Sequence, residues 1–175
     1  MRHDVFKYIR TVPDYPVKGI DFYDLNSLFA SRVWNSCVVD FCEGIGWGDI
    51  FEHVTHIAGI ESRGFVVGQA IAYEMAKPFV MIRKKGSKYP GELLSADYDL
   101  EYGSNTLVLQ TGILGHTSRV LIADDLIATA GSLTAAKDLV EQTGATVVGA
   151  ATVVDLAYLR DKSPTEIYSM GTKNG

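Results

Sequence analysis

Residues 120–136 read VLIADDLIATAGSLTAA, and this stretch decides the fold. Four apolar residues run directly into two adjacent acids, Asp124 and Asp125. A run of small residues follows at 128–132 (ATAGS), and a helical pattern begins there. A short apolar run that leads through a small-residue turn into a helix is typical of a buried strand in a parallel sheet. The stretch therefore predicts a strand–turn–helix unit whose turn carries polar chemistry.

The rest of the chain repeats this alternation of strands and helices. Apolar runs predict strands over 53–60, 78–84, 119–125, 145–155 and 166–170. Helical spacing predicts a short helix ahead of Pro13 and longer helices over 27–43, 64–76 and 132–142, and segments 93–98 and 105–110 suit a hairpin. Alternating strands and helices indicate an α/β fold with a mostly parallel sheet. Right-handed crossovers bring the strand carboxyl ends to one edge, where open α/β sheets bind ligands.

Composition places the chain among ordinary globular proteins. It has 175 residues, of which 47% are apolar and 21% are charged, and this length suits a single domain. The net charge of −5 argues against a nucleic-acid partner and against an anionic membrane surface. The N-terminal stretch lacks the apolar core of a signal peptide, and no run approaches the ~18 apolar residues of a membrane span.

The two cysteines, Cys37 and Cys42, fit a reduced cytoplasmic protein. They lie five positions apart, without a CxxC motif or a histidine-rich tract nearby. We expect buried free thiols; a single disulfide is the alternative, and a thiolate metal site is a further one.

The small-residue turn at 128–132 has the features of a phosphate-binding loop. With little side chain in the way, backbone N–H groups can surround a phosphate, and the following helix adds the positive end of its dipole. Thr129 and Ser132 add hydroxyl donors. The turn is neither a GxxxxGK[ST] loop nor a GxGxxG loop, so it belongs to neither of those nucleotide-binding classes.

Two acids beside a phosphate would repel it, unless the ligand also carries hydroxyl groups or a hard cation. Carboxylates accept hydrogen bonds from a ribose diol and help to hold Mg²⁺. The residues therefore predict a sugar-phosphate site, with the phosphate in the loop and the ribose and metal at Asp124 and Asp125. The alternative is that the acids form a surface turn and that ATAGS is a plain helix start.

The strand, acid pair and ATAGS loop resemble the phosphoribosyl pyrophosphate (PRPP) signature of type I phosphoribosyltransferases, in which ATGGT follows the acids. Four further segments, GIESRGFVVGQAIA, IRKKGSKYPGE, YDLEYGSNTLVL and YPVKGIDFYDL, resemble segments of the adenine phosphoribosyltransferases in order and spacing. The resemblance covers about residues 8–156. It implies a Rossmann-like, mostly parallel sheet flanked by helices, in one domain over 1–175. A small N-terminal hood over about 1–30 and a flexible flap over about 84–103 complete the expected fold.

The resemblance also implies the reaction. Adenine and PRPP would give AMP and pyrophosphate as the base nitrogen displaces pyrophosphate from C1 of the ribose, through an oxocarbenium-like transition state. Mg²⁺ would be held by PRPP oxygens and water, with Asp124 and Asp125 as candidate direct ligands. A homodimer with small-molecule substrates is expected, with the region from Arg83 to Lys88 near the partner.

The matching motifs imply a role for each candidate residue. The PRPP-binding set is Asp124 and Asp125 for the ribose, Ala128, Thr129, Ala130, Gly131 and Ser132 for the 5′-phosphate, and Arg63, Arg83, Lys84 and Lys88 for the pyrophosphate. The base-binding set is Asp21, Phe22 and Leu156. The catalytic set is Arg63, Glu101 and Tyr102, with Glu101 as general acid/base. On the residues alone, a surface ion pair for Arg63, a core position for Phe22 and an ordinary hairpin turn for Glu101 and Tyr102 are the alternatives.

Three departures from the family pattern matter. Ala130 replaces a glycine of the loop, and we expect it to serve only with a negative φ. Ser87 lengthens the start of the flap by one residue, which affects which lysine faces the pyrophosphate; we expect Lys88. Asp21 and Tyr23 replace an apolar and a basic residue, and an extra carboxylate near the base suits the N1–H and 2-amino donors of guanine.

Three other functions compete with adenine transfer. The first is the same reaction on guanine, hypoxanthine or xanthine. The second is a regulator that senses PRPP, but such a protein usually has a DNA-binding domain or a basic face. The third is a Mg²⁺-dependent phosphatase or kinase, which would leave the ESRG, LEYG and GIDF segments unexplained.

Overall fold

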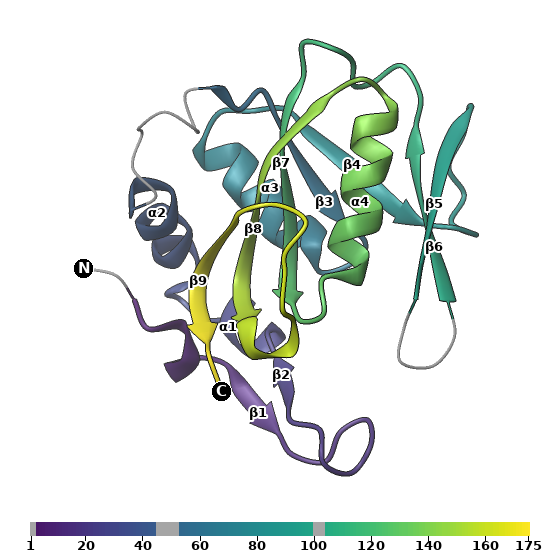
Figure 1. Cartoon of the computed structure of the whole chain (residues 1–175). Helices are drawn as coiled ribbons and strands as arrows, with labels where there is room; N and C mark the ends of the chain where they lie inside the picture. Colours follow the sequence, from purple (N-terminus) through teal and green to yellow (C-terminus); the bar gives the residue numbers. More distant parts are fainter. Residues whose placement is uncertain (1–2, 45–52, 100–103) are drawn as a thin grey trace.

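A mixed seven-stranded sheet forms the centre of the computed structural model, which describes residues 3–44, 53–99 and 104–175. The strands of this sheet are β3 (His56–Ile60), β4 (Phe79–Lys84), β5 (Leu93–Asp99), β6 (Ser104–Gln110), β7 (Arg119–Ile127), β8 (Thr146–Leu156) and β9 (Ile167–Lys173). Their order is β5-β6-β4-β3-β7-β8-β9. The five strands from β4 to β9 in this order are parallel, and the β5–β6 hairpin joins them antiparallel through β4. The predicted α/β class and mostly parallel sheet are confirmed (Figure 1).

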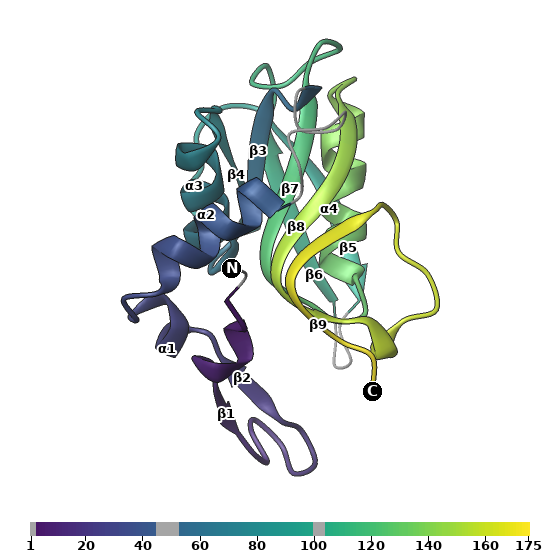
Figure 2. The same ribbon diagram turned by 90° about the vertical axis from the view of Figure 1, so that its left-hand side faces the viewer.

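Helices cover both faces of the sheet. Figure 2 shows α2 (Trp34–Gly44) and α3 (Gly64–Glu74) on one face and α4 (Gly131–Gln142) on the other. Residues of β3 and β7 alternate between the two cores: Ile57 and Leu121 pack with α2 and α3, while Ala58 and Ile122 pack with α4. A strand that is buried on both faces needs apolar residues at nearly every position. This requirement explains the unbroken apolar run VLIA before the acid pair.

The N-terminal segment differs from the short helix expected ahead of Pro13. It forms a single 3-10 turn, η1 (Val5–Lys7), and then strand β1 (Arg10–Val12). β1 pairs antiparallel with β2 (Phe22–Asp24), and neither strand is among those predicted from the apolar runs. Pairing with a distant strand therefore overrides the local helical spacing. This two-stranded sheet projects below the main sheet (Figure 1).

The helix expected over 27–43 is two helices. The first, α1 (Asn26–Phe29), ends where the amide and hydroxyl of Ser31 both donate to the carbonyl of Leu28, at 2.9 and 2.7 Å. A serine that bonds to its own turn competes with the helical ladder. The chain restarts at Trp34, and α2 carries both cysteines, which are buried and free.

The remaining elements follow the prediction within three residues at each boundary. The β5–β6 hairpin is confirmed, and its connecting residues 100–103, with Glu101 and Tyr102, lie outside the described residues. β7 does not stop at the acid pair as expected: it continues to Ile127, because Asp124, Leu126 and Ile127 keep pairing with β8. Among the described helices, none is long and apolar enough to span a membrane.

Candidate active site

The carboxyl ends of three strands meet around one polar cavity of about 240 Å³. Strand β3 contributes the turn at 61–63, β4 contributes Lys84, and β7 contributes the acid pair. The full lining is Ile60, Glu61, Ser62, Arg63, Lys84, Tyr98, Asp124, Asp125, Leu126 and Ser132. Five of the residues singled out from the sequence are therefore brought together here: Arg63, Lys84, Asp124, Asp125 and Ser132.

A second cavity, of about 320 Å³, lies between the N-terminal segment, α2 and β9. It is larger, but the acid in its lining, Asp40, already pairs with His3 at 2.8 Å. The smaller cavity combines acidic and basic side chains with the start of a helix, which are the features that a sugar phosphate needs, so it is the candidate site.

Both residues of the acid pair line the cavity, and Asp124 is more exposed than Asp125. Asp125 is only 5% exposed, and its amide donates to Asp124 Oδ1 at 2.9 Å. Burial raises the pKa of both carboxyls, and the neighbouring Asp125 charge raises that of Asp124 further. Arg63 opposes the rise at Asp125, since its Nε lies 2.9 Å from Asp125 Oδ2. Two adjacent carboxyls, one buried and one partly buried, gain from any ligand that brings hydroxyl donors or a cation.

Arg63 links the acid pair to Phe22, the aromatic residue expected to stack on the base. It immediately precedes α3, and its guanidinium carbon lies 5.5 Å from the centroid of the Phe22 ring. Because the guanidinium is planar, it stacks on aromatic faces much as a heterocycle does. Asp21, next to Phe22, is exposed, and Leu156 is buried at the end of β8. The structure thus connects one expected base-binding residue directly to the acid pair.

Two glycines allow α3 to approach the acid pair closely. A Cβ on Gly64 would lie 2.8 Å from the carbonyl oxygen of Ala123 and 3.0 Å from Asp124 Oδ1. A Cβ on Gly59 would lie 2.8 Å from the carbonyl oxygen of Gly64. Real Cβ atoms essentially never come within 3.0 Å of such atoms. The glycines of the GIESRG segment therefore set the distance between the helix and the strand that carry Arg63 and the acids.

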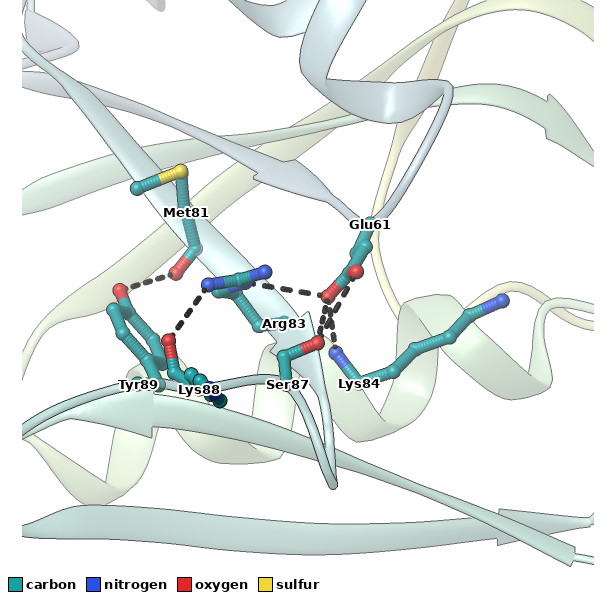
Figure 3. A network of polar contacts seen from close by, with 7 residues as sticks. All are labelled: Glu61, Met81, Arg83, Lys84, Ser87, Lys88 and Tyr89. Atoms are coloured by element: carbon teal, nitrogen blue, oxygen red, sulfur yellow. Dashed lines mark hydrogen bonds and ion pairs between the residues drawn. The ribbon is translucent and has the colours of Figure 1, made fainter.

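Glu61 fastens the segment after β4 to the turn after β3 (Figure 3). Its carboxylate accepts the amide of Lys84 at 2.8 Å, the Ser87 hydroxyl at 3.0 and 3.2 Å, and Arg83 Nε at 3.4 Å. Burial alone would raise the pKa of Glu61, but these donors outweigh it and lower the pKa. Ser87, the residue that lengthens the flap start, is thus a hydrogen-bonded part of the site.

The three basic residues around this network point in different directions. Lys84 lines the cavity, and Figure 3 shows its side chain extending away from Arg83. The Arg83 guanidinium lies 5.4 Å from the centroid of the Tyr89 ring and donates to the carbonyl of Lys88 at 3.2 Å. Lys88 is exposed, and neither it nor Arg83 belongs to the cavity lining. Of these three basic residues, Lys84 is the one that lines the cavity together with the acid pair.

The phosphate loop contradicts the expectation for Ala130. Its φ is +66° and its ψ is +18°, which is the left-handed conformation that favours glycine. For an alanine this conformation costs roughly 1–2 kcal/mol. The methyl group is 5% exposed and packs in the core on the α4 face of the sheet, so the loop is held from inside the protein. Ala130 is also the N-cap of α4 and offers no side-chain hydrogen bond, so the amides of the first turn are left for another acceptor.

Sequence reasoning missed several residues of the site. Tyr98 and Leu126 line the cavity, and Arg160 donates from Nη1 to the carbonyl of Ala128 at 3.1 Å. The direction of Tyr98 depends on the register of the hairpin, and Arg160 lies 32 residues from its partner. No local pattern in the sequence predicts that Tyr98 faces the cavity or that Arg160 contacts Ala128. Glu61 lies inside the quoted ESRG motif, so its polarity after a buried strand was a usable signal.

Comparison with known proteins agrees with this geometry. The model of the phosphoribosyl transferase domain family matches residues 47–172. The adenine phosphoribosyltransferase of Brevibacillus brevis is 42% identical over 164 residues, which cover 91% of this chain and 92% of the relative. The crystal structure of the enzyme from Thermoanaerobacter pseudethanolicus has a TM-score of 0.88 at 32% identity, and covers 99% of this chain and 100% of that chain.

The enzyme from Saccharomyces cerevisiae, complexed with D-2,5-dideoxy-2,5-imino-altritol 1,6-bisphosphate and adenine, has a TM-score of 0.86 at 32% identity. That match covers 96% of this chain and 97% of the yeast chain. The resemblance noted in the sequence is therefore confirmed by the family match, by curated relatives and by solved structures. The chain belongs to the adenine phosphoribosyltransferases, within the type I phosphoribosyltransferase family.

Proposed function

We infer that this protein transfers the phosphoribosyl group of PRPP to adenine, giving AMP and pyrophosphate in purine salvage. The observation that carries the inference is the cavity in which a buried acid pair, Arg63 and the uncapped start of α4 converge. The yeast relative, whose fold matches over nearly the whole chain, is complexed with adenine and a sugar-like bisphosphate. The chemistry of this cavity suits the same two kinds of ligand.

The phosphate loop and the acid pair would bind the ribose 5-phosphate part of PRPP. Residues 128–132 would hold the 5′-phosphate, with the first amides of α4 as donors and its dipole as the attraction. Asp124 and Asp125 would accept hydrogen bonds from the ribose hydroxyls. These bonds would replace the bonds to water that the carboxylates lose on burial. Holding the sugar at both ends fixes C1 for in-line displacement.

Mg²⁺ fits this site as a partly protein-bound ion. Among the described residues, no three His, Cys, Asp or Glu side chains converge as a metal site. The ion would therefore take most ligands from PRPP oxygens and water, with Asp124 and Asp125 as its carboxylate contacts. When bound, it neutralises charge on the departing pyrophosphate.

Positive side chains would stabilise the pyrophosphate as it leaves. Arg63 lies against the acid pair, with its Nε 2.9 Å from Asp125 Oδ2, and its planar guanidinium suits a bidentate phosphate contact once it leaves Phe22. Lys84 lines the same cavity and adds a second charge. We assign Arg83 and Lys88 to a closed state of the flap, because both lie outside the cavity here.

Phe22 would stack on the adenine ring, with Leu156 on the opposite side and the backbone near Asp21 at the base edge. The guanidinium of Arg63 over the Phe22 ring supports this role, since a planar group already sits on that face. Glu101 would exchange a proton with the base, and Tyr102 would help to close the flap. A homodimer working in the cytoplasm completes the proposal.

A base-competition assay tests the function. Purified protein, PRPP and Mg²⁺ would be mixed separately with adenine, guanine, hypoxanthine or xanthine, and nucleotide formation followed. AMP well above the other products supports adenine. A preference for guanine would place specificity at the exposed carboxylate of Asp21. No product from any base, with PRPP still bound, would favour the PRPP-sensing regulator.

A further inference from the structure

We propose that Arg160 is a positioning residue for the phosphate loop, which it braces through the backbone carbonyl of Ala128 while Asp155 holds its guanidinium in place. The proposal rests on the assignment of residues 128–132 to the 5′-phosphate. In this proposal Arg160 itself does not contact the substrate. Its effect on the reaction is to fix the shape of the loop that binds PRPP.

The contacts of Arg160 join two segments at the end of the sheet. Arg160 follows η3 (Ala157–Leu159), just after β8 ends. Its Nη2 donates to Asp155 Oδ1 at 2.6 Å, and its Nη1 donates to the carbonyl of Ala128 at 3.1 Å and to that of Leu156 at 3.4 Å. Asp155 lies on β8 directly beside Ile127, the last residue of β7. The Asp155–Arg160 pair, which we call the brace, is therefore anchored on β8, the strand beside the end of β7 from which the phosphate loop begins.

Burial separates this ion pair from an ordinary surface salt bridge. The side chains of Arg160 and Asp155 are each 10% exposed. A buried guanidinium needs both a counter-charge and acceptors for its remaining N–H groups, and the two carbonyls supply those acceptors. Asp155 thus balances the charge of Arg160, and the remaining N–H groups of the guanidinium bind the backbone carbonyls of Ala128 and Leu156.

The loop has a reason to need such a brace. Ala130, two residues after Ala128, is held at φ +66°, a conformation that an alanine disfavours. At the α4 end, the carbonyl of Ala130 accepts both the amide and the hydroxyl of Thr134, each at 2.9 Å. At the β7 end, Arg160 holds the carbonyl of Ala128. With both ends fixed, the strained residue between them cannot relax to a negative φ without breaking one of these contacts.

The bond to Ala128 also matters for the charge that the loop presents. Carbonyl oxygens repel phosphate, so a phosphate loop must keep its carbonyls engaged elsewhere and leave its amides free. The Ala128 carbonyl is engaged by a cation, which removes that oxygen as an acceptor. Leu156 is a weaker target, because its backbone is already held by pairing with Lys173 on β9.

Steady-state kinetics of Arg160→Ala test the proposal. We expect KM for PRPP to rise about tenfold, as when one charged hydrogen bond that shapes a site is lost. We expect kcat and KM for adenine to change by less than about threefold, because Leu156 keeps its β9 pairing. Arg160→Lys should give an intermediate rise, since one ammonium cannot span both Asp155 and Ala128. Arg119→Ala, an exposed arginine at the other end of β7, is the matched control and should leave all three constants unchanged.

A double variant separates positioning from general support. Glycine takes the left-handed conformation freely, so Ala130→Gly in the Arg160→Ala background should recover part of the lost PRPP affinity. A normal KM for PRPP in folded Arg160→Ala would overturn the proposal. The proposal would also be overturned if KM for both substrates rose and kcat fell by the same factor, without recovery by Ala130→Gly. If Arg160→Ala does not fold, the same comparison is made with Arg160→Lys.

A second measurement keeps this proposal separate from the proposed function. PRPP binding is followed by calorimetry in the wild type, Arg160→Ala and Arg160→Lys, without any base. A wild type that forms no nucleotide would contradict the proposed function, and the calorimetric comparison would still decide the brace. Active wild type with unchanged PRPP affinity in Arg160→Ala would contradict the brace alone.

Discussion

Replacing Gly64 with alanine tests how tightly α3 is packed against the acid pair. The new Cβ would lie 2.8 Å from the carbonyl oxygen of Ala123, 3.0 Å from Asp124 Oδ1 and 3.2 Å from Asp124 Cα. Ordinary contact begins near 3.4 Å, so the helix start or the strand must shift by a few tenths of an ångström. Two of the three atoms belong to the backbone of β7, which cannot move aside as a flexible side chain would.

Two opposing effects set the size of the change. Overpacking of this kind destabilises by about 1–3 kcal/mol. An alanine at the start of a helix returns up to about 1 kcal/mol through a less flexible unfolded chain. The net loss should therefore be about 1–2 kcal/mol, which lowers Tm by roughly 2–8 °C for a chain of this size. Because the strain falls on Asp124 and beside Arg63, KM for PRPP should rise as well.

Calorimetry and PRPP kinetics would measure both effects. Gly115→Ala is the matched control, because a Cβ there has nothing within 4 Å. It should leave Tm unchanged or slightly raised, with normal kinetics. If Gly64→Ala matched Gly115→Ala in both Tm and KM, close packing of α3 on the acid pair would be refuted as the reason for a glycine at this position.

Four further predictions follow from the site. Replacing Asp124 and Asp125 together with asparagine would remove the two charged hydrogen bonds that we propose to the ribose, each worth about 1.5–3 kcal/mol. We therefore expect kcat/KM to fall roughly 100-fold or more while circular dichroism stays normal; unchanged kinetics would exclude the ribose role. Burial raises the pKa of Asp124 above its usual 3.8, so the folded state binds a proton that the unfolded state releases, and the stability of the wild type relative to this double variant should fall as pH rises through the folded pKa; a flat difference curve from denaturant titrations would contradict this. Glu61→Gln removes the charge that holds Ser87 and the Lys84 amide, so KM for PRPP should rise by about threefold to tenfold, and an equal effect from Ser87→Ala would assign the change to the hydroxyl contact. Glu101→Ala should lower kcat more than it raises KM; the reverse would mean that Glu101 only binds.

The chemistry of the site could be predicted from the sequence because it lies at strand ends. Polar residues directly after the buried runs at 57–60 and 120–123 have few structural uses, and parallel strands bring their carboxyl ends to one edge. This is why Arg63 and the acid pair were found. The α/β class was equally accessible, since burial on both faces imposes unbroken apolar runs.

Long-range pairing was not accessible in the same way. β1 forms because its partner β2 lies ten residues further along, and neither strand has a strong pattern of its own. The sign of φ at Ala130 also cannot be inferred from residue type, because alanine normally avoids the left-handed region. It is set by contacts at both ends of the loop, one of them from Arg160. Residues that act through the backbone of a distant segment leave no local signal.

The site combines three features that are unfavourable for the protein alone, and PRPP has a group that relieves each of them. Burial disfavours charge on the adjacent carboxyls, which ribose hydroxyls and Mg²⁺ would stabilise. The start of α4 has no side-chain cap, and a 5′-phosphate would accept its free amides. Arg63 divides its guanidinium between Asp125 and Phe22, whereas a pyrophosphate would offer it a full bidentate partner. A move of Arg63 to the pyrophosphate would uncover the Phe22 face on which the base would stack. The same side chain would thus connect the binding of PRPP to the opening of the base site.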